Sequence, residues 1–178
     1  DMDATAIIGE TLDELSTYTP HKAEIDNLTR QSVNGLMSFS DTLVARMQLM
    51  RGLPAETLAE TWSTVQPMPG MKVAIATMRA HGAYTALVSG GFSYFTSRVR
   101  DLIGFDCDIA NDLELRDGRI TGRIPPPVID PAGKVEAVRD RGKKRAVFLV
   151  MAGQHEGRRA GGVVAQHPFD IAIDRQAT

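Results

Sequence analysis

Cysteine is almost absent from this chain, since Cys107 is the only one among 178 residues. A single cysteine cannot form a disulfide within the chain, which excludes the disulfide-stabilised secreted domains as a class. Reduced thiols are typical of the cytoplasm, so we expect a cytoplasmic protein.

Long apolar runs and an excess of one charge are absent as well. The longest apolar run, residues 146–152, is far shorter than the ~20 residues that a membrane-spanning helix needs. The 20 basic and 22 acidic residues nearly cancel and leave a net charge of -2. We therefore expect neither a membrane nor a nucleic acid as a partner.

The first third of the chain has the pattern of a helical lobe. Helices are expected over residues 22–33, from Ser38 as an N-cap onwards, and over residues 55–65 with Pro54 in the first turn. Together with the residues before them, they make a lobe of four helices. The Pro-Met-Pro-Gly run at residues 67–70 predicts a hinge after this lobe.

Beyond the hinge, helices and strands alternate. Alternation with short connections predicts an α/β fold, in which helices flank a parallel sheet. The Asp117-Gly118 step predicts a β-hairpin with arms at residues 113–116 and 120–123. The other expected elements are helices over residues 71–80, 94–103 and 132–141, and strands over residues 84–88, 145–151, 163–165 and 171–173.

The first five residues, Asp1-Met2-Asp3-Ala4-Thr5, place two carboxylates two positions apart. In an extended segment residues i and i+2 face the same way, so Asp1 and Asp3 are expected to share one face. Beside a divalent cation such a pair suits phosphoryl transfer, because one carboxylate can attack phosphorus while the other carries the proton. A solvated acidic turn is the competing interpretation.

Two further segments have the residues of a phosphate site. Ser89-Gly90-Gly91 lies between an apolar strand and a helix, where a hydroxyl and backbone amides can hold phosphoryl oxygens. A simple strand-to-helix turn explains the same residues. Lys134 lies just inside an expected helix start, where a cation is disfavoured unless it has an anionic partner or points into water.

Taken in order, these motifs resemble the haloacid-dehalogenase-type phosphatases and, in detail, the phosphoserine phosphatase branch of that family. The similarity covers nearly the whole chain. Several matches in the same order and spacing favour the functional interpretation over the competing ones. The further segments that carry the resemblance are Arg51-Gly52-Leu53-Pro54, Val88-Ser89-Gly90-Gly91-Phe92 and Asp117-Gly118-Arg119-Ile120-Thr121-Gly122.

The resemblance implies a role for each candidate residue of the phosphate site. Asp1 would be the nucleophile and Asp3 the general acid and base. Both would bind Mg2+, Asp3 through its backbone carbonyl. Ser89, Gly90 and Lys134 would bind the phosphoryl group and stabilise charge on its oxygens.

The resemblance also implies how the amino-acid head of the substrate would be bound. Glu10 stands where this branch keeps a glutamate for the substrate ammonium. Arg46 stands where an arginine takes the substrate carboxylate, which a guanidinium can clamp with two parallel hydrogen bonds. Phe39 would lie beside them in an inserted helical cap.

The implied activity is hydrolysis of O-phospho-L-serine to L-serine and phosphate through an aspartyl-phosphate, the last step of serine biosynthesis. The expected partners are this small phosphorylated amino acid, Mg2+ and a second copy of the chain in a homodimer. The implied architecture is a doubly wound, mostly parallel core at residues 1–8 and 68–178, with a helical cap at residues 9–67 and a β-hairpin insertion. The first core strand would precede Asp1, so an upstream segment of the same protein is expected.

The late metal-binding motif of the family, Gly-Asp-Gly-Ala-Asn-Asp, is missing after the strand that ends at Val150. Ala152 stands in place of the expected aspartate, His155 in place of the substrate-binding asparagine, and Glu156 in place of the final aspartate. Loss of one carboxylate weakens a Mg2+ site, and Glu156 is the residue that would compensate. A single-base frame slip between Arg141 and Ala160 would explain the altered motif.

Two alternatives stay open. A degenerate, non-catalytic homologue or fragment would keep the fold without the activity, and Ala152 favours it. A related phosphatase or phosphotransferase would act on another small amino-alcohol phosphate. Intact Asp1, Asp3, Ser89 and Lys134 favour an enzyme.

Overall fold

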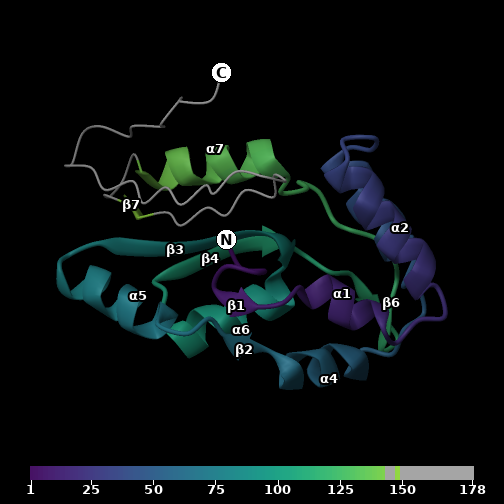
Figure 1. The fold of residues 1–178 in the computed structure, drawn as a ribbon, viewed down its shortest axis with the longest axis horizontal. Coiled ribbons are helices and arrows are strands. Elements are labelled where there is room, and N and C mark those ends of the chain that lie inside the picture. Colours follow the sequence, from purple (N-terminus) through teal and green to yellow (C-terminus); the bar gives the residue numbers. More distant parts are fainter. Residues whose placement is uncertain (143–146, 149–178) are drawn as a thin grey trace.

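A parallel sheet of three strands lies between two layers of helices in the computed structural model, which describes residues 1–142 and 147–148 (Figure 1). β3 (Tyr84–Phe92) is the middle strand. It pairs in parallel with β4 (Cys107–Asn111) on one side and with β7 (Val147–Phe148) on the other. The parallel sheet that the alternating pattern predicts is confirmed.

Helices cover both faces of this sheet. α7 (Pro131–Gly142) lies on one face, and α5 (Met71–Ala80) and α6 (Ser93–Ile103) lie on the other (Figure 1). The bounds predicted for these three helices are correct to within one residue at each end. The α/β fold class is therefore confirmed.

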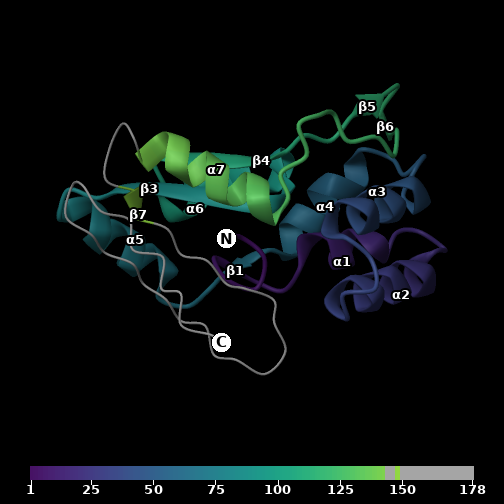
Figure 2. The same cartoon turned by 90° about the horizontal axis from the view of Figure 1, so that it is seen from above.

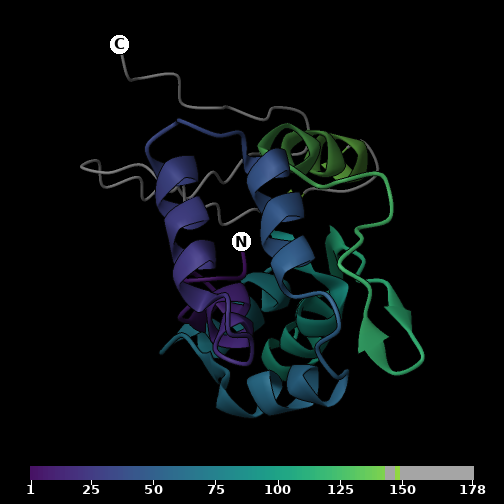
Figure 3. The ribbon, with the colours of Figure 1, turned by 90° about the vertical axis from the view of Figure 1, so that its right-hand side faces the viewer.

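Four helices precede the sheet and lie together to one side of it (Figure 2). They are α1 (Thr11–Ser16), α2 (Lys22–Val33), α3 (Phe39–Leu49) and α4 (Glu56–Thr64). α2 and α3 stand side by side (Figure 3). The predicted N-cap of α3 is confirmed, because Ser38 Oγ accepts a hydrogen bond from the Asp41 amide at 3.1 Å. Among the described residues, no helix combines the length and the apolar character needed to cross a membrane.

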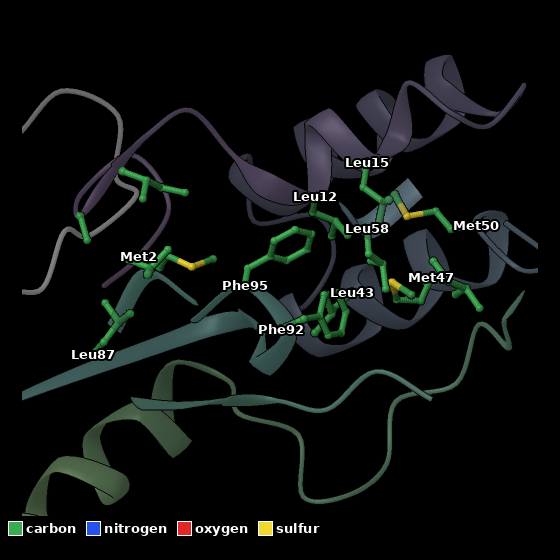
Figure 4. Close-up of a cluster of buried hydrophobic side chains, with 14 of the residues drawn as sticks. Met2, Leu12, Leu15, Leu43, Met47, Met50, Leu58, Leu87, Phe92 and Phe95 are labelled. Atoms are coloured by element: carbon green, nitrogen blue, oxygen red, sulfur yellow. The ribbon is translucent and has the colours of Figure 1, made fainter. Parts of the chain in front are cut away.

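The hydrophobic core runs from the sheet into these four helices without a break (Figure 4). Phe92 at the end of β3 and Phe95 on α6 lie in its middle, and both rings are fully buried. Met2 and Leu87 adjoin them on the side of the sheet. On the helical side lie Leu12, Leu15, Leu43, Met47, Met50 and Leu58. Burial of this shared apolar surface holds the helices against the sheet.

One local prediction about the helical part is wrong, and a second region differs in part from the expected structure. Pro54 is not in the first turn of α4, because the helix begins at Glu56 and Pro54 forms an isolated bridge with Arg119 instead. The expected hinge at residues 67–70 is partly strand, since β2 (Gln66–Pro67) pairs with β1 (Ile7–Ile8). This pairing ties together the segments that enter and leave the helical part.

The Asp-Gly step forms the predicted hairpin, with shorter arms than expected. β5 (Leu115–Arg116) pairs with β6 (Arg119–Ile120), and Asp117 and Gly118 both have a positive φ, of 50° and 70°. Two positive φ angles are what a two-residue hairpin turn of matching twist requires. The hairpin contacts the α3–α4 connection, where the Gly52 amide donates to a β6 carbonyl at 2.8 Å.

The extended conformation predicted for the first residues is wrong beyond Met2. Residues 3–6 form a turn in which Ala4 has a φ of 48° and the Ala6 amide donates to the Met2 carbonyl at 2.8 Å. The direction of the Asp3 side chain is therefore set by a turn, and not by the alternation of a strand.

β4 has no counterpart among the predicted strands. Its sequence contains the polar residue Asp108. The Asp108 carboxylate accepts hydrogen bonds from the Thr96 hydroxyl and from Arg100, both at 2.7 Å. Both partners lie on α6, so the polar group is satisfied within the fold. A pattern based on apolar alternation misses such a strand.

The later predicted strands are described only in part. Of the strand expected over residues 145–151, residues 147–148 form β7. The strands expected over residues 163–165 and 171–173 lie outside the described residues.

The Asp106 carboxylate joins the start of β4 to β3. Its Oδ2 accepts hydrogen bonds from the Thr85 amide at 2.7 Å and the Thr85 hydroxyl at 2.8 Å, and Arg79 lies 3.0 Å from Oδ1. Burial acts to raise the pKa of Asp106, but the hydrogen bonds and Arg79 outweigh it and hold the pKa below the ordinary 3.8. The ionised carboxylate therefore stabilises the fold.

We predict that Asp106→Ala lowers the free energy of unfolding by about 1–3 kcal/mol at neutral pH, because the buried Thr85 amide loses its acceptor. Since the folded-state pKa lies below the unfolded value, the contribution of Asp106 is complete above pH 3.8 and is lost as the pH falls through the folded-state pKa. Urea unfolding at neutral and at acidic pH measures both effects. Asp26→Asn, which breaks a surface pair with Lys22 on α2, is the control. An equal decrease in the free energy of unfolding of Asp106→Ala and Asp26→Asn would contradict the prediction.

Candidate active site

Asp1 and Lys134, 133 positions apart in the chain, meet at the edge of the sheet. Lys134 Nζ donates to Asp1 Oδ1 at 2.9 Å, and the side chains are 19% and 17% exposed. Lys134 belongs to α7, whose first turn is held by Asp130, because that carboxylate accepts from the Gly133 amide at 2.7 Å. The lysine at this helix start therefore has an anionic partner, and the alternative that it points into water is wrong.

Asp3 is partly buried and is held by α1. Its Oδ1 accepts hydrogen bonds from the Thr11 amide at 2.8 Å and from the Thr11 hydroxyl at 2.9 Å. Burial raises the pKa of Asp3 above its ordinary value, although the Thr11 hydrogen bonds and Lys134 act to lower it. A carboxyl group with a raised pKa keeps its proton to higher pH, which suits a general acid.

Asp3, Ser89 and the backbone of Gly91 approach one another closely. A Cβ atom placed on Gly91 would lie 3.2 Å from Asp3 Oδ2 and 3.2 Å from Ser89 Oγ, so both oxygens face the same point. Ser89 is buried, and its hydroxyl oxygen accepts a hydrogen bond from the Gly91 amide at 2.9 Å. A side chain at position 91 would crowd both oxygens, so glycine permits this close approach.

Phe39 brings the start of α3 over the glycines of β3. A Cβ atom placed on Gly90 would lie 2.5 Å from the ring carbon Cζ of Phe39, closer than side-chain carbons approach one another. The ring is 36% exposed, so one of its sides covers Gly90 while another borders solvent. The helical part thus reaches the edge of the sheet at this point.

Arg46 on α3 is surrounded by carboxylates. Its Nη2 donates to Asp13 Oδ1 on α1 at 2.5 Å, while its Nε is buried and has no hydrogen-bond partner in the described part of the chain. Burial lowers the pKa of Arg46, and Asp13 and Glu10 act to raise it. Burial likewise lowers the pKa of Lys134, and Asp3 and Glu10 oppose that shift. Glu10 therefore lies within electrostatic reach of both cations.

The Asp1 carboxylate and the Asp3 backbone carbonyl are oxygen donors of the kind that Mg2+ prefers. Within residues 1–142 and 147–148, no three His, Cys, Asp or Glu side chains gather in a group that could hold a metal. The described residues fit two ligands of such a site, while Ala152 and Glu156 lie outside them.

The residues predicted to bind a phosphoryl group come together at the carboxyl end of β3, although separate segments supply them. Phe39 covers the same place, and Glu10 and Arg46 lie on the neighbouring helical side. His155 lies outside the described residues, so its place in the site stays a prediction. The residues that the structure brings together are Asp1, Asp3, Ser89, Gly90 and Lys134.

Two residues that orient this site have no place in the sequence-based prediction. Thr11 holds Asp3, and Asp13 holds Arg46. Asp13 follows Glu10 by three positions at the start of α1, and residues three apart share a helix face. That spacing is the signal in the sequence from which Asp13 could have been found.

Ligands of open parallel sheets bind beyond the carboxyl ends of the strands, and turns rich in glycine amides bind anions there. The fold and the site therefore define an α/β protein with two acidic groups and a lysine at the place where such sheets bind ligands. More specifically, the chain belongs to the haloacid dehalogenase-like hydrolase family, whose model matches residues 1–156.

Similar proteins include several phosphoserine phosphatases. That of Archaeoglobus fulgidus is 35% identical over 147 residues, which cover 83% of this chain and 43% of that protein. A solved structure of a substrate-bound phosphoserine phosphatase complex has a TM-score of 0.76 at 27% identity. A phospho-aspartyl intermediate analogue of phosphoserine phosphatase has a TM-score of 0.75 at 28% identity. Both alignments cover 81% of this chain and 69% of the other. The chain thus spans less than half the length of its Archaeoglobus relative.

We predict that Thr11→Val raises the pKa of Asp3 further, because the lost hydroxyl hydrogen bond stabilises the charged form of the carboxyl group. The Thr11 amide bond remains in this variant. Carbon-detected NMR titration of the Asp3 carboxyl group in metal-free buffer measures the shift. Thr11→Ser keeps the hydroxyl and is the matched control, so equal pKa values in the two variants would refute the prediction.

Proposed function

We propose that this chain hydrolyses O-phospho-L-serine to L-serine and phosphate, with the phosphoryl group carried transiently on Asp1. The observation that supports this most is the 2.9 Å contact between Asp1 Oδ1 and Lys134 Nζ, next to a second carboxyl group on Asp3 whose pKa is raised. A nucleophile, a fixed cation and a proton carrier are thereby available at one place. The relatives that are named phosphoserine phosphatases give the substrate.

In the first step, an Asp1 carboxylate oxygen attacks phosphorus, and the bond between phosphorus and the serine oxygen breaks. Negative charge stays on the other phosphoryl oxygens. The Lys134 ammonium, the Ser89 hydroxyl and the Gly90 amide would be the donors that stabilise that charge.

Asp3 carries the proton in both steps. It first gives its proton to the leaving serine oxygen. It then takes a proton from the water that attacks the phosphoryl group on Asp1, which releases phosphate and restores both side chains. Burial raises the pKa of Asp3 and thereby favours the protonated form that the first step needs.

The amino-acid head of the substrate would contact the helical side of the site. Arg46 is held by Asp13 through one nitrogen, and its buried Nε is available for the substrate carboxylate. Glu10, in reach of the same region, suits the substrate ammonium. Phe39 shields the reacting groups from bulk water on the side of Gly90.

These contacts support a division of the chain into two parts. Residues 9–67 act as a helical cap that recognises the amino-acid head, and residues 1–8 and 68–178 act as the core that carries the chemistry. The paired strands β1 and β2 lie at the junction. A homodimer and a cytoplasmic location are further parts of this proposal.

Mg2+ held by Asp1 and Asp3 would supply positive charge between the carboxylates and the phosphoryl group. Asp3 would bind through its backbone carbonyl, which leaves its carboxyl group to carry the proton. Glu156 is the candidate for the third acidic ligand, since Ala152 cannot serve.

A degenerate homologue that binds an anion without turnover is the second candidate, and the alanine at position 152 favours it. A related phosphatase for another small amino-alcohol phosphate is the third. A measurement of turnover distinguishes the degenerate homologue from the proposed enzyme. A comparison of substrates distinguishes the related phosphatase from it.

We predict that phosphate release from O-phospho-L-serine requires Mg2+ and both acidic residues. Asp1→Asn removes the nucleophile and should abolish turnover, whereas Asp3→Asn removes the proton carrier and should lower kcat by about 10²–10⁴-fold. Release of inorganic phosphate with Mg2+, and after chelation, measures this. Asp101→Asn, on the exposed end of α6, is the control. Turnover by Asp1→Asn at the rate of Asp101→Asn would refute the proposal.

We predict that Arg46→Met raises KM for O-phospho-L-serine by about 10–100-fold with little change in kcat, because a charged hydrogen bond to the substrate carboxylate is lost. O-phosphoethanolamine has no carboxylate, so its KM should not change. Arg46→Lys keeps the charge but cannot form two parallel hydrogen bonds. Its KM for O-phospho-L-serine should therefore lie between those of wild type and Arg46→Met. An equal rise in KM for both substrates would show that Arg46 does not bind the substrate carboxylate.

A further inference from the structure

The pairing of β3 with β4 is interrupted at the glycines of the site. Val88 is paired with Ile109, but the next pair is Phe92 with Asn111. Three residues of β3, positions 89–91, therefore lie opposite a single residue of β4. An insertion of this kind takes backbone groups out of the ladder and re-aims the chain. Here the interruption falls at Ser89-Gly90-Gly91, within β3.

The Asn111 side chain supplies the hydrogen bond that the interrupted ladder cannot make. Its Nδ2 donates to the Gly90 carbonyl at 2.8 Å, and the residue is 1% exposed. A buried carbonyl without a donor would cost about 1–3 kcal/mol. Asn111 therefore holds the Gly90 peptide in place through its carbonyl.

The other half of the same amide group holds the segment that leads to Lys134. Asn111 Oδ1 accepts a hydrogen bond from the Ile129 amide at 2.6 Å, and Nδ2 lies 3.4 Å from the Ile129 carbonyl. The following residue is Asp130, whose carbonyl accepts the Lys134 amide at 2.9 Å in the first turn of α7. One planar side chain thus joins Gly90 to the start of the helix that carries Lys134.

We propose that Asn111 is a positioning residue that sets the spacing between the Gly90 backbone and Lys134, and hence the affinity of the site for a phosphoryl group. This inference rests on the proposed function for the identity of the ligand. Asn111 does not contact the substrate. It acts by fixing the Gly90 backbone of the sheet relative to the segment that starts α7.

An asparagine suits this place because the two segments make opposite demands. Gly90 needs a donor, and the Ile129 amide needs an acceptor. An aspartate of the same shape keeps the acceptor but turns a carboxylate oxygen toward the Gly90 carbonyl. A purely structural role would lower stability in the same variant without a specific effect on phosphate.

The test compares Asn111→Asp with wild type in the binding of inorganic phosphate, measured by calorimetry on the full chain with Mg2+ present. Phosphate needs the Gly90 and Lys134 donors, whereas L-serine needs only the amino-acid contacts. We expect the Kd for phosphate to rise by about 10–100-fold, as for a displacement of about 1 Å in a positioned group, and the Kd for L-serine to stay unchanged. Thr96→Val, which removes another buried hydrogen bond at β4, is the control for lost stability.

The outcomes are distinct. Unchanged phosphate affinity in Asn111→Asp, or an equal loss in Thr96→Val, overturns the inference, and so does a wild-type chain that binds no phosphate. If wild type binds phosphate but does not hydrolyse O-phospho-L-serine, the proposed function fails while the phosphate comparison still decides the role of Asn111. If Asn111→Asp does not fold, Asn111→Ser, which keeps a shorter hydroxyl, replaces it in the same measurement.

Discussion

Burial disfavours the charged form of a carboxyl group, and the site depends on giving each of its two carboxyl groups a partner. Asp1 is paired with the Lys134 ammonium, and Asp3 accepts both donors of Thr11. Lys134 also lowers the pKa of Asp3, so one cation acts on both carboxyl groups. The two partners come from α7 and α1, and the charge balance therefore requires both helices to pack beside the same end of the sheet.

Gly90 is the point at which the parts of the molecule meet. The Phe39 ring from the helical side covers one side of this glycine, and the Asn111 amide holds its carbonyl from β4. No side chain larger than hydrogen fits against the ring, so the close approach of α3 to the sheet requires glycine. The continuous core around Phe92 and Phe95 keeps α3 at this distance. Packing far from the site thus determines how closely the helical part covers it.

Local features of the fold follow from the sequence alone. The bounds of α2, the N-cap at Ser38 and the turn at Asp117-Gly118 are correct because each depends on residues only a few positions apart. The error at Pro54 has the opposite cause, because Pro54 pairs with Arg119, a distant residue of the hairpin. The turn at Asp3 is local, but its sequence carries no Asn-Gly or Pro-Gly step that would predict it.

For the site, the sequence determined which chemical groups are present: two carboxylates, a hydroxyl beside two glycines, and a lysine near a helix start. Each of them separately has an ordinary explanation on a solvated surface. The tertiary structure decided that Lys134 reaches Asp1 and that Asp13, rather than water, takes Arg46. The reason is physical: an ion pair across 133 positions forms only when the packing of α7 on the sheet has brought the two charges together, and local propensity carries no information about that distance.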